Sequence, residues 1–190
     1  MTKTGTALLC TLALGVCLPA GAAGFKHENK PENLRALFSS IHQATHGKKD
    51  TKQAAELMQS VMPDEARVRK ALKDNAPADV VQRIVGFHKK MAPVSERDVV
   101  KLAKPEQKNV QVHGAKTEEI VAYRQGSVAF KEFPGGAKKV AEQVLRPGMT
   151  FYEVEFLEPG KDAGMKYHLF YWDGKQWSML GPVWRLLEAK

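Results

Sequence analysis

The sequence feature that most constrains the fold is an aromatic-rich stretch near the C-terminus, residues 148–190. It holds nine of the chain's fifteen aromatic residues, including all three tryptophans. Two of its segments alternate between side chains that suit opposite faces of a sheet, which is typical of strands. Asp173-Gly174 follows the second segment, and Asp-Gly between two such runs is a strong hairpin signal. We therefore predict an antiparallel meander whose inner face forms the main core.

The second strand of this meander, residues 166–172, is apolar or aromatic on both faces. Regular alternation places His168 on the same face as Phe170 and Trp172. A strand of this kind belongs in the middle of a sheet, with both faces covered. We expect helices on one side, and either the N-terminal helices or an open pocket on the other. A third strand over residues 176–180 follows, and residues 183–187 extend it or begin a fourth.

Short amphipathic helices dominate the first half of the chain. Asp50 and Gln53 resemble a capping pair, Pro63 ends the helix that they open, and Ser95-x-x-Asp98 resembles a capping box. Apolar residues recur at helical spacing between these signals. The expected helices run over residues 31–46, 51–62, 64–74, 77–91 and 95–103.

The segment between these helices and the meander mixes both kinds of element. Residues 104–109 are linker-like and form either a domain boundary or a loop between helices and sheet. Val110 and Val112 indicate a short strand, and residues 127–133 alternate like another. Helices are expected over residues 118–125 and 137–145.

The fold class is therefore α+β. A helical segment of four to five short helices, residues 25–104, precedes a mixed or antiparallel sheet segment, residues 109–190. Whether the two segments form one continuous domain stays open. The order of elements is similar to that of the cone-shaped folds of the nuclear-transport-factor type, in which helices close one side of a curved sheet. This resemblance concerns element order and implies no function.

The N-terminus carries the pattern of an export signal. Lys3 is followed by an apolar run from Ala7 to Leu18, too short to span a bilayer, and then by small residues that suit a peptidase. We expect a cleaved signal peptide over residues 1–23 and a periplasmic or extracellular protein. Lipidation at Cys17 is disfavoured because Val16, rather than a small residue, precedes it. Cys10 and Cys17 are the two cysteines of the chain, so the mature chain is expected to lack disulfides and thiolate metal sites.

The charge of the chain is positive and uneven. Residues 25–104 carry sixteen Lys and Arg against ten Asp and Glu, whereas residues 105–190 carry twelve against eleven. A basic first half would attract anionic lipid, an anionic envelope polymer or an envelope protein, whereas the alternative interpretation is a solvated surface. Acidic residues are interspersed, and no aromatic platform accompanies the basic ones, which argues against nucleic acid. No second apolar stretch approaches the length of a transmembrane helix.

Two histidines are the weak candidates for a metal site. His42 and His46 stand four residues apart on an expected helix, a spacing that lets two imidazoles share one ion. A helical projection puts both on the flank and back of the helix, and no HExxH pattern accompanies them. We expect a solvated pair of histidines, no metal and no cofactor.

Candidate catalytic residues lie on the meander. Glu153 and Glu155 are predicted on the strand next to His168, and a histidine beside a carboxylate is the minimum for general acid–base chemistry. Strand register decides whether they meet, because a shift of one residue moves His168 to the opposite face. In the alternative interpretation, both glutamates face solvent and His168 is a hydrogen-bonded residue at the edge of the core.

The candidate ligand-binding residues are Trp172, Trp177 and Tyr167, whose rings could stack on a sugar. Trp172 and Trp177 flank a tight turn, where cross-strand pairing is the commoner reason for two aromatic residues. Phosphate-loop and serine-hydrolase motifs are absent from the sequence. The function we expect is a non-enzymatic binding or accessory module of the cell envelope. The alternative is a small cofactor-free lyase, isomerase or hydrolase that uses the Glu/His group.

Overall fold

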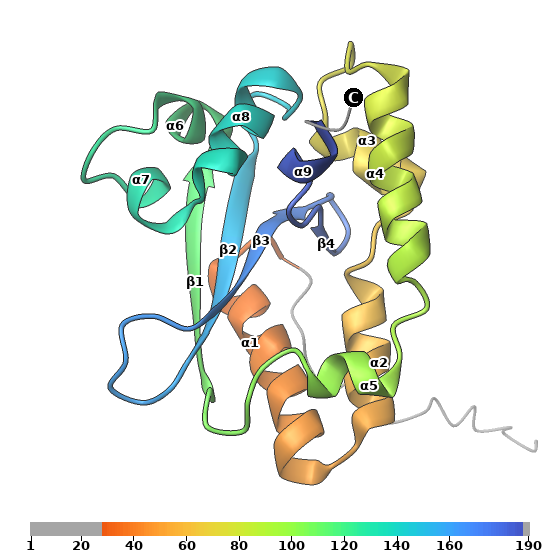
Figure 1. The fold of residues 1–190 in the computed structure, drawn as a ribbon, viewed down its shortest axis with the longest axis vertical. Helices are drawn as coiled ribbons and strands as arrows, with labels where there is room; N and C mark the ends of the chain where they lie inside the picture. Colours follow the sequence, from red (N-terminus) through yellow and green to blue (C-terminus); the bar gives the residue numbers. More distant parts are fainter. Residues whose placement is uncertain (1–27, 188–190) are drawn as a thin grey trace, which may run out of the picture.

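A computed structural model describes residues 28–187 of the chain. The predicted signal peptide, with Cys10 and Cys17, lies outside these residues. Within the described part, helices come first and the strands of an antiparallel sheet lie in the C-terminal half (Figure 1), which confirms the α+β class. None of the helices in this part is both long enough and apolar enough to cross a membrane.

The predicted caps open the N-terminal helices. The Asp50 carboxylate accepts a hydrogen bond from the Gln53 N–H at 3.0 Å, and Ser95 and Asp98 form the expected capping box. The expected first helix continues into a π-helical turn. The elements of this half are α1 (Pro31–His42), η1 (Gln43–Lys48), α2 (Thr51–Ser60), α3 (Glu65–Ala71), α4 (Ala78–Met91) and α5 (Glu96–Val100).

The C-terminal half contains the sheet and four short helices. Its strands stand in the order β1-β2-β3-β4, each antiparallel to its neighbour. The elements are β1 (Asn109–Lys116), α6 (Thr117–Ala122), α7 (Val128–Glu132), α8 (Gly135–Gln143), β2 (Thr150–Leu157), β3 (Met165–Trp172), β4 (Trp177–Met179) and α9 (Trp184–Leu187).

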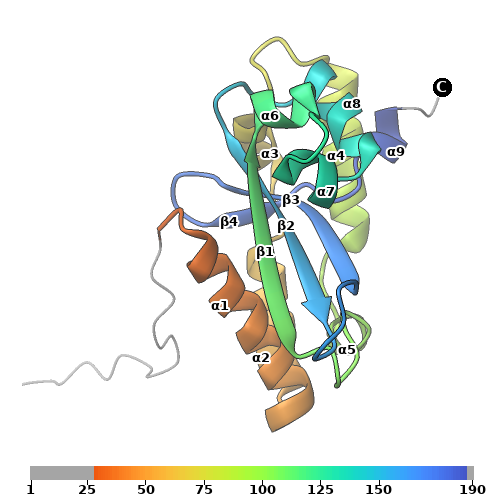
Figure 2. The ribbon, with the colours of Figure 1, turned by 90° about the vertical axis from the view of Figure 1, so that its left-hand side faces the viewer.

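Helices cover both faces of the sheet. On one face α1 lies along the strands (Figure 2), and the Phe38 ring stands 6.0 Å from that of Phe156 and 5.0 Å from that of Phe170. On the other face Phe151 and Tyr171 belong to a second core, which includes residues of α3, α4 and α8. The pairing of β3 with β2 on one edge and with β4 on the other confirms that β3 is an inner strand, and both of its faces are covered. This two-sided cover differs from the one-sided cover that the resemblance to nuclear-transport-factor folds implied.

The expected face of His168 is wrong, because β3 contains a bulge. Tyr152 pairs with Phe170 and Val154 pairs with Tyr167, so His168 and Leu169 together stand opposite Glu153. Leu169 adopts a left-handed backbone with φ of 57°. The extra residue turns His168 away from Phe170 and Trp172 and towards the face that carries Glu153 and Glu155.

The strand predicted over residues 127–133 is also wrong, because this segment forms α7. The Ser127 hydroxyl accepts a hydrogen bond from the Phe130 N–H at 3.2 Å and so caps the helix. Ala129 and Phe133, four residues apart, are buried, whereas Val128 and Phe130 are exposed. An i, i+4 burial pattern belongs to a helix, and over seven residues it is easily mistaken for alternation.

Residues 183–187 do not form a strand either. Gly181, with φ of 73°, and Pro182 end the pairing of β4 with β3, and α9 follows as a single helical turn. Trp184 on this turn reaches the start of α8. A Cβ atom on Gly136 would lie 2.4 Å from the indole ring, so only glycine allows this close contact.

Candidate functional site

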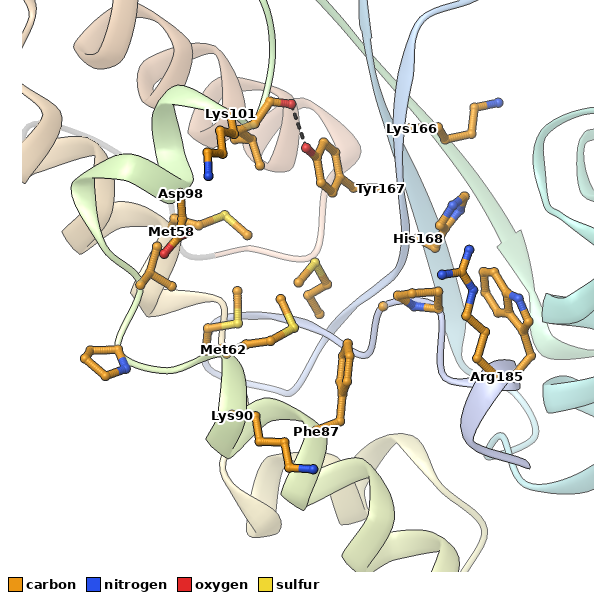
Figure 3. Close-up of a pocket in the computed structure, with 18 residues that line it drawn as sticks. Met58, Met62, Phe87, Lys90, Asp98, Lys101, Lys166, Tyr167, His168 and Arg185 are labelled. Atoms are coloured by element: carbon orange, nitrogen blue, oxygen red, sulfur yellow. Dashed lines mark hydrogen bonds between the residues drawn. The ribbon is translucent and has the colours of Figure 1, made fainter. Parts of the chain in front are cut away.

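A cavity of about 620 Å³ lies between the helical segment and the sheet (Figure 3). Its walls come from α4 and α5, from the end of α2, from β3 and from α9. Volumes of this size are typical of small-molecule sites. The lining residues are Met58, Met62, Phe87, Lys90, Met91, Pro93, Val94, Asp98, Lys101, Leu102, Lys166, Tyr167, His168, Met179, Gly181, Pro182, Trp184 and Arg185.

Much of the cavity wall is apolar and adaptable. Met58, Met62, Met91 and Met179 line it together with Phe87. Methionine side chains are unbranched and polarizable, so they fit apolar partners of different shapes. Met91 is exposed although it is apolar, as expected for a residue at an open mouth. This wall suits the apolar part of a ligand.

Three cations stand around the cavity on separate elements. Lys90 ends α4, Lys101 follows α5 and Arg185 belongs to α9 (Figure 3). All three are exposed, and no ion pair or hydrogen bond of their side chains occurs among residues 28–187. The one carboxylate among the described lining residues, Asp98, is bonded to Ser95 in the capping box of α5 and also interacts with the charge of Lys101, which leaves an excess of two positive charges. The mouth of the cavity is therefore positively charged.

Lys166 also lines the cavity, but its charge is already compensated. Its ammonium lies 2.9 Å from Glu132 Oε2 and 3.4 Å from Glu155 Oε2. Burial alone would lower the pKa of Lys166, but the two carboxylates outweigh it and raise the pKa. In Figure 3 the side chain points away from the middle of the cavity. We therefore do not count Lys166 among the free charges of the mouth.

The bulge brings His168 against Glu153. The imidazole Nδ1 bonds to Glu153 Oε2, and the other carboxylate oxygen accepts the N–H of Leu169 at 3.3 Å. His168 lines the cavity, whereas Glu153 is 0% exposed and lies behind it. A carboxylate behind one ring nitrogen fixes the orientation of the imidazole and leaves the other nitrogen for a ligand. The interpretation in which Glu153 and Glu155 face solvent is wrong, since Glu155 is only 6% exposed.

The protonation of Glu153 depends on this burial. Burial raises the pKa of Glu153, and the hydrogen bond and charge of His168 oppose the rise. Glu155 takes a different part, because its Oε1 accepts the Gly164 N–H at 2.8 Å and its Oε2 faces Lys166. The structure thus brings Glu153 and His168 together at the cavity wall and holds Glu155 in the neighbouring ion-pair network.

Tyr167 and the tryptophans of the meander lie on the α1 side of the sheet. Tyr167 lines the cavity, and its hydroxyl donates to the Leu102 carbonyl at 2.6 Å. Burial raises its pKa to about 12. Trp172 and Trp177 pair across β3 and β4 with ring centroids 5.4 Å apart, and neither lines the cavity. Trp184, which sequence reasoning did not single out, does line it and stands 5.2 Å from the His168 ring.

His42 and His46 hold a loop. His42 Nε2 lies 3.1 Å from the Lys104 carbonyl oxygen and His46 Nε2 lies 2.9 Å from that of Ala103. A carbonyl only accepts, so each Nε2 carries a hydrogen and donates it. The expectation of a solvated pair is wrong for His42, which is buried. These donated bonds use one nitrogen of each ring for the fold.

A different group has the residue types of a metal site. His113, Glu132 and Glu155 each offer a ligand atom, and these atoms lie within 4.8 Å of one another. The Lys166 ammonium already stands beside both carboxylates, so its single positive charge offsets part of their negative charge without an ion. Sequence reasoning missed this group because Glu132 was assigned to a strand, and α7 carries it instead.

Sequence reasoning also missed the basic mouth. Lys90 lies near the end of α4, Lys101 directly after α5 and Arg185 in a helical turn that was predicted as a strand, so no spacing in the sequence connects them. Comparisons with protein-family models, with curated proteins and with solved structures give no match.

Proposed function

We propose that this protein is an exported binding module whose ligand is a small amphiphile with a negatively charged head. The observation that carries the proposal is the cavity of about 620 Å³, in which an apolar, methionine-rich wall meets an outer ring of Lys90, Lys101 and Arg185. Burying an apolar tail there supplies most of the binding free energy. The cations attract a negatively charged head and repel a positively charged one. The predicted signal peptide supports the exported location.

Titration with three twelve-carbon probes, each kept below its micellar or solubility limit, tests this function. Dodecanoate carries a negative head, dodecanol a neutral one and dodecyltrimethylammonium a positive one. We expect dodecanoate to bind about tenfold or more tightly than dodecanol, since one good charge contact is worth about 1.4 kcal/mol. The cationic probe should bind most weakly. Equal affinity for all three, or no saturable heat in calorimetry, would contradict the proposal.

Charge-neutral variants locate the interaction. The triple variant Lys90→Gln, Lys101→Gln and Arg185→Gln should remove the preference for dodecanoate and leave dodecanol binding unchanged. Lys89→Gln is the matched control, because Lys89 is exposed on the same helix and does not line the cavity. If Lys89→Gln lowered the affinity as much as the triple variant, the effect would come from net charge rather than from the cavity mouth.

Acid–base catalysis is the second candidate function, and the Glu153–His168 contact favours it. His168 would act as the general base at the cavity wall, and Glu153 would be the positioning residue behind it. None of the described residues that line the cavity is a serine or a cysteine, so such a reaction would use water or a proton of the substrate itself.

Hydrolysis of acyl p-nitrophenyl esters, measured over a range of chain lengths, separates the two functions. A catalyst should give a rate that depends on chain length and falls by 10²-fold or more, on the order of a lost general base, in His168→Gln. That variant should keep its affinity for dodecanoate. A binding module should bind the acid and show no ester hydrolysis above that of its His168→Gln variant.

A further inference from the structure

We propose that the free edge of β1 pairs with an extended acidic segment of a partner protein, which joins the sheet as an added strand. This surface is separate from the cavity and does not depend on the function proposed for it. β1 is at one end of the strand order, and all its residues from Asn109 to Lys116 pair with β2 without a shift in register. Alternate residues of such a strand direct their N–H and C=O groups away from the sheet.

The outward groups of β1 lack partners in the described chain. Apart from the Lys116 N–H, which donates to Glu119, no β1 backbone group bonds to anything but β2 among residues 28–187. In Figure 2, β1 is the nearest of the strands, with α1 along one side of it. Figure 1 shows α7 and the β2–β3 loop to the left of β1, so they flank the upper and lower parts of its edge, and neither is drawn over the stretch between them. A row of unpaired backbone groups is a template for another strand.

The middle of β1 lacks the usual devices that keep a sheet edge from pairing, although Lys108 and Lys116 flank it. Between Val110 and Ala115 there is no proline, lysine or carboxylate, and the pairing with β2 contains no bulge. The opposite edge of the sheet is protected, because β4 has only three residues and the Met179 N–H bonds to the Val61 carbonyl at 2.9 Å. Only the β1 edge is therefore both long and accessible within the described part of the chain.

A hollow beside this edge indicates the chemistry of the partner. It has a volume of about 600 Å³ and is lined by Arg35 and Ser39 of α1 and by residues 108–113. Arg35 and Lys108 are exposed cations, and no carboxylate is among the lining residues that the structure describes. Side chains that an added strand directs towards α1 would enter this hollow. Acidic residues there would face Arg35 and Lys108, and apolar ones would face Val112.

The same charges argue against pairing with a second copy of this chain. Two β1 edges in antiparallel contact would bring Lys108 and Lys116 of one copy close to those of the other. Like charges opposed on neighbouring strands are destabilising. An acidic peptide gains from these charges, and a second copy does not.

Synthetic ten-residue peptides that alternate Glu with Val or Thr are the probes for this edge. We expect saturable binding by fluorescence anisotropy, and about tenfold or greater loss when alternate backbone nitrogens on one edge are methylated, because strand addition relies on main-chain hydrogen bonds. Peptides with Lys in place of Glu should not bind. Binding that survives methylation on either edge, or absence of binding by every acidic peptide, would overturn the proposal.

Protein variants provide the second arm of the test. Arg35→Glu with Lys108→Glu should abolish binding of the Glu peptides and allow the Lys peptides to bind. Lys89→Glu, on α4 away from this edge, should change neither. Val112→Pro, which removes an N–H that faces away from β2, should block both peptides while circular dichroism shows a retained fold. Sedimentation of the protein alone completes the test, since a dimer that the acidic peptide cannot dissociate would identify the occupant as a second copy.

Discussion

Arg67 on α3 and Asp173 in the β3–β4 turn form an ion pair of 2.9 Å across more than half of the chain. Their side chains are 13% and 2% exposed. The same guanidinium donates to the Ser178 hydroxyl at 2.9 Å and to the Met62 carbonyl at 2.8 Å. One arginine therefore connects the end of α2, the start of α3 and the last hairpin of the sheet.

Removing this arginine should destabilise the protein strongly. Arg67→Ala leaves the buried Asp173 carboxylate unpaired, and loss of one partner of a buried pair costs about 3–5 kcal/mol. Arg67→Lys should cost about 2 kcal/mol, because a lysine cannot reproduce the planar fork of donors. Urea denaturation measures both. Arg69→Ala is the control on the same helix, since its pair with Glu65 is exposed and should be worth under about 1 kcal/mol.

Gly136 and Gly135 offer a matched pair of substitutions. A Cβ on Gly136 would meet Trp184 at 2.4 Å, whereas one on Gly135 would meet nothing within 4 Å. Gly136→Ala should therefore displace Trp184, change its fluorescence and cost about 1–3 kcal/mol, as overpacking usually does. Gly135→Ala should be neutral or stabilising by a few tenths of a kcal/mol or so. Dodecanoate binding should weaken only in Gly136→Ala, because Trp184 lines the cavity.

His88 should make the protein acid-sensitive. It is buried on α4, and burial lowers its pKa to about 4 from an ordinary value of 6.5. The unfolded chain then binds a proton that the folded chain excludes. The contribution of neutral His88 to stability is therefore complete above pH ~6.5 and is lost as the pH falls towards 4. The loss amounts to roughly 3 kcal/mol. His88→Leu should gain stability relative to the natural chain over this range. Above pH 7 the difference between their free energies of unfolding should be constant.

Glu153 should have the opposite pH dependence. Its folded-state pKa is raised by burial, so the proton it holds in the folded state is lost as the pH rises from about 4.5 through the raised pKa. The folded state becomes less stable over that range because the charged form is poorly solvated. Glu153→Gln lacks this titration. The free energy of unfolding of Glu153→Gln should rise relative to that of the natural chain as the pH rises. A difference that stays constant with pH would contradict the assignment.

The helical half could be predicted well because its signals are local. Asp50 and Ser95 cap the helices that they were expected to cap, and Pro63 follows the end of α2. The meander could also be predicted, since aromatic alternation and Asp173-Gly174 identify strands and their turn. Each of these features depends on neighbours within a few residues.

The parts that could not be predicted depend on contacts between distant residues. The left-handed Leu169 carries no sequence signal, because glycine is the residue that usually marks such a backbone. The environment of His42 is set by the carbonyl of Lys104, 62 residues away. The cavity lies between elements that are far apart in the sequence, among them α2, α4, β3 and α9, and no local pattern encodes the space between them.

The bulge at Leu169 has a consequence for the whole of β3. Before Leu169 the even-numbered residues of β3 face the side of the sheet opposite α1, and after it the even-numbered residues face α1. Without the bulge, Lys166 and His168 would point into the apolar layer beneath α1, and Tyr167 would lie among the carboxylates. Because of this one left-handed residue, the face of the sheet opposite α1 carries charged side chains at one end of β3 and aromatic rings at the other.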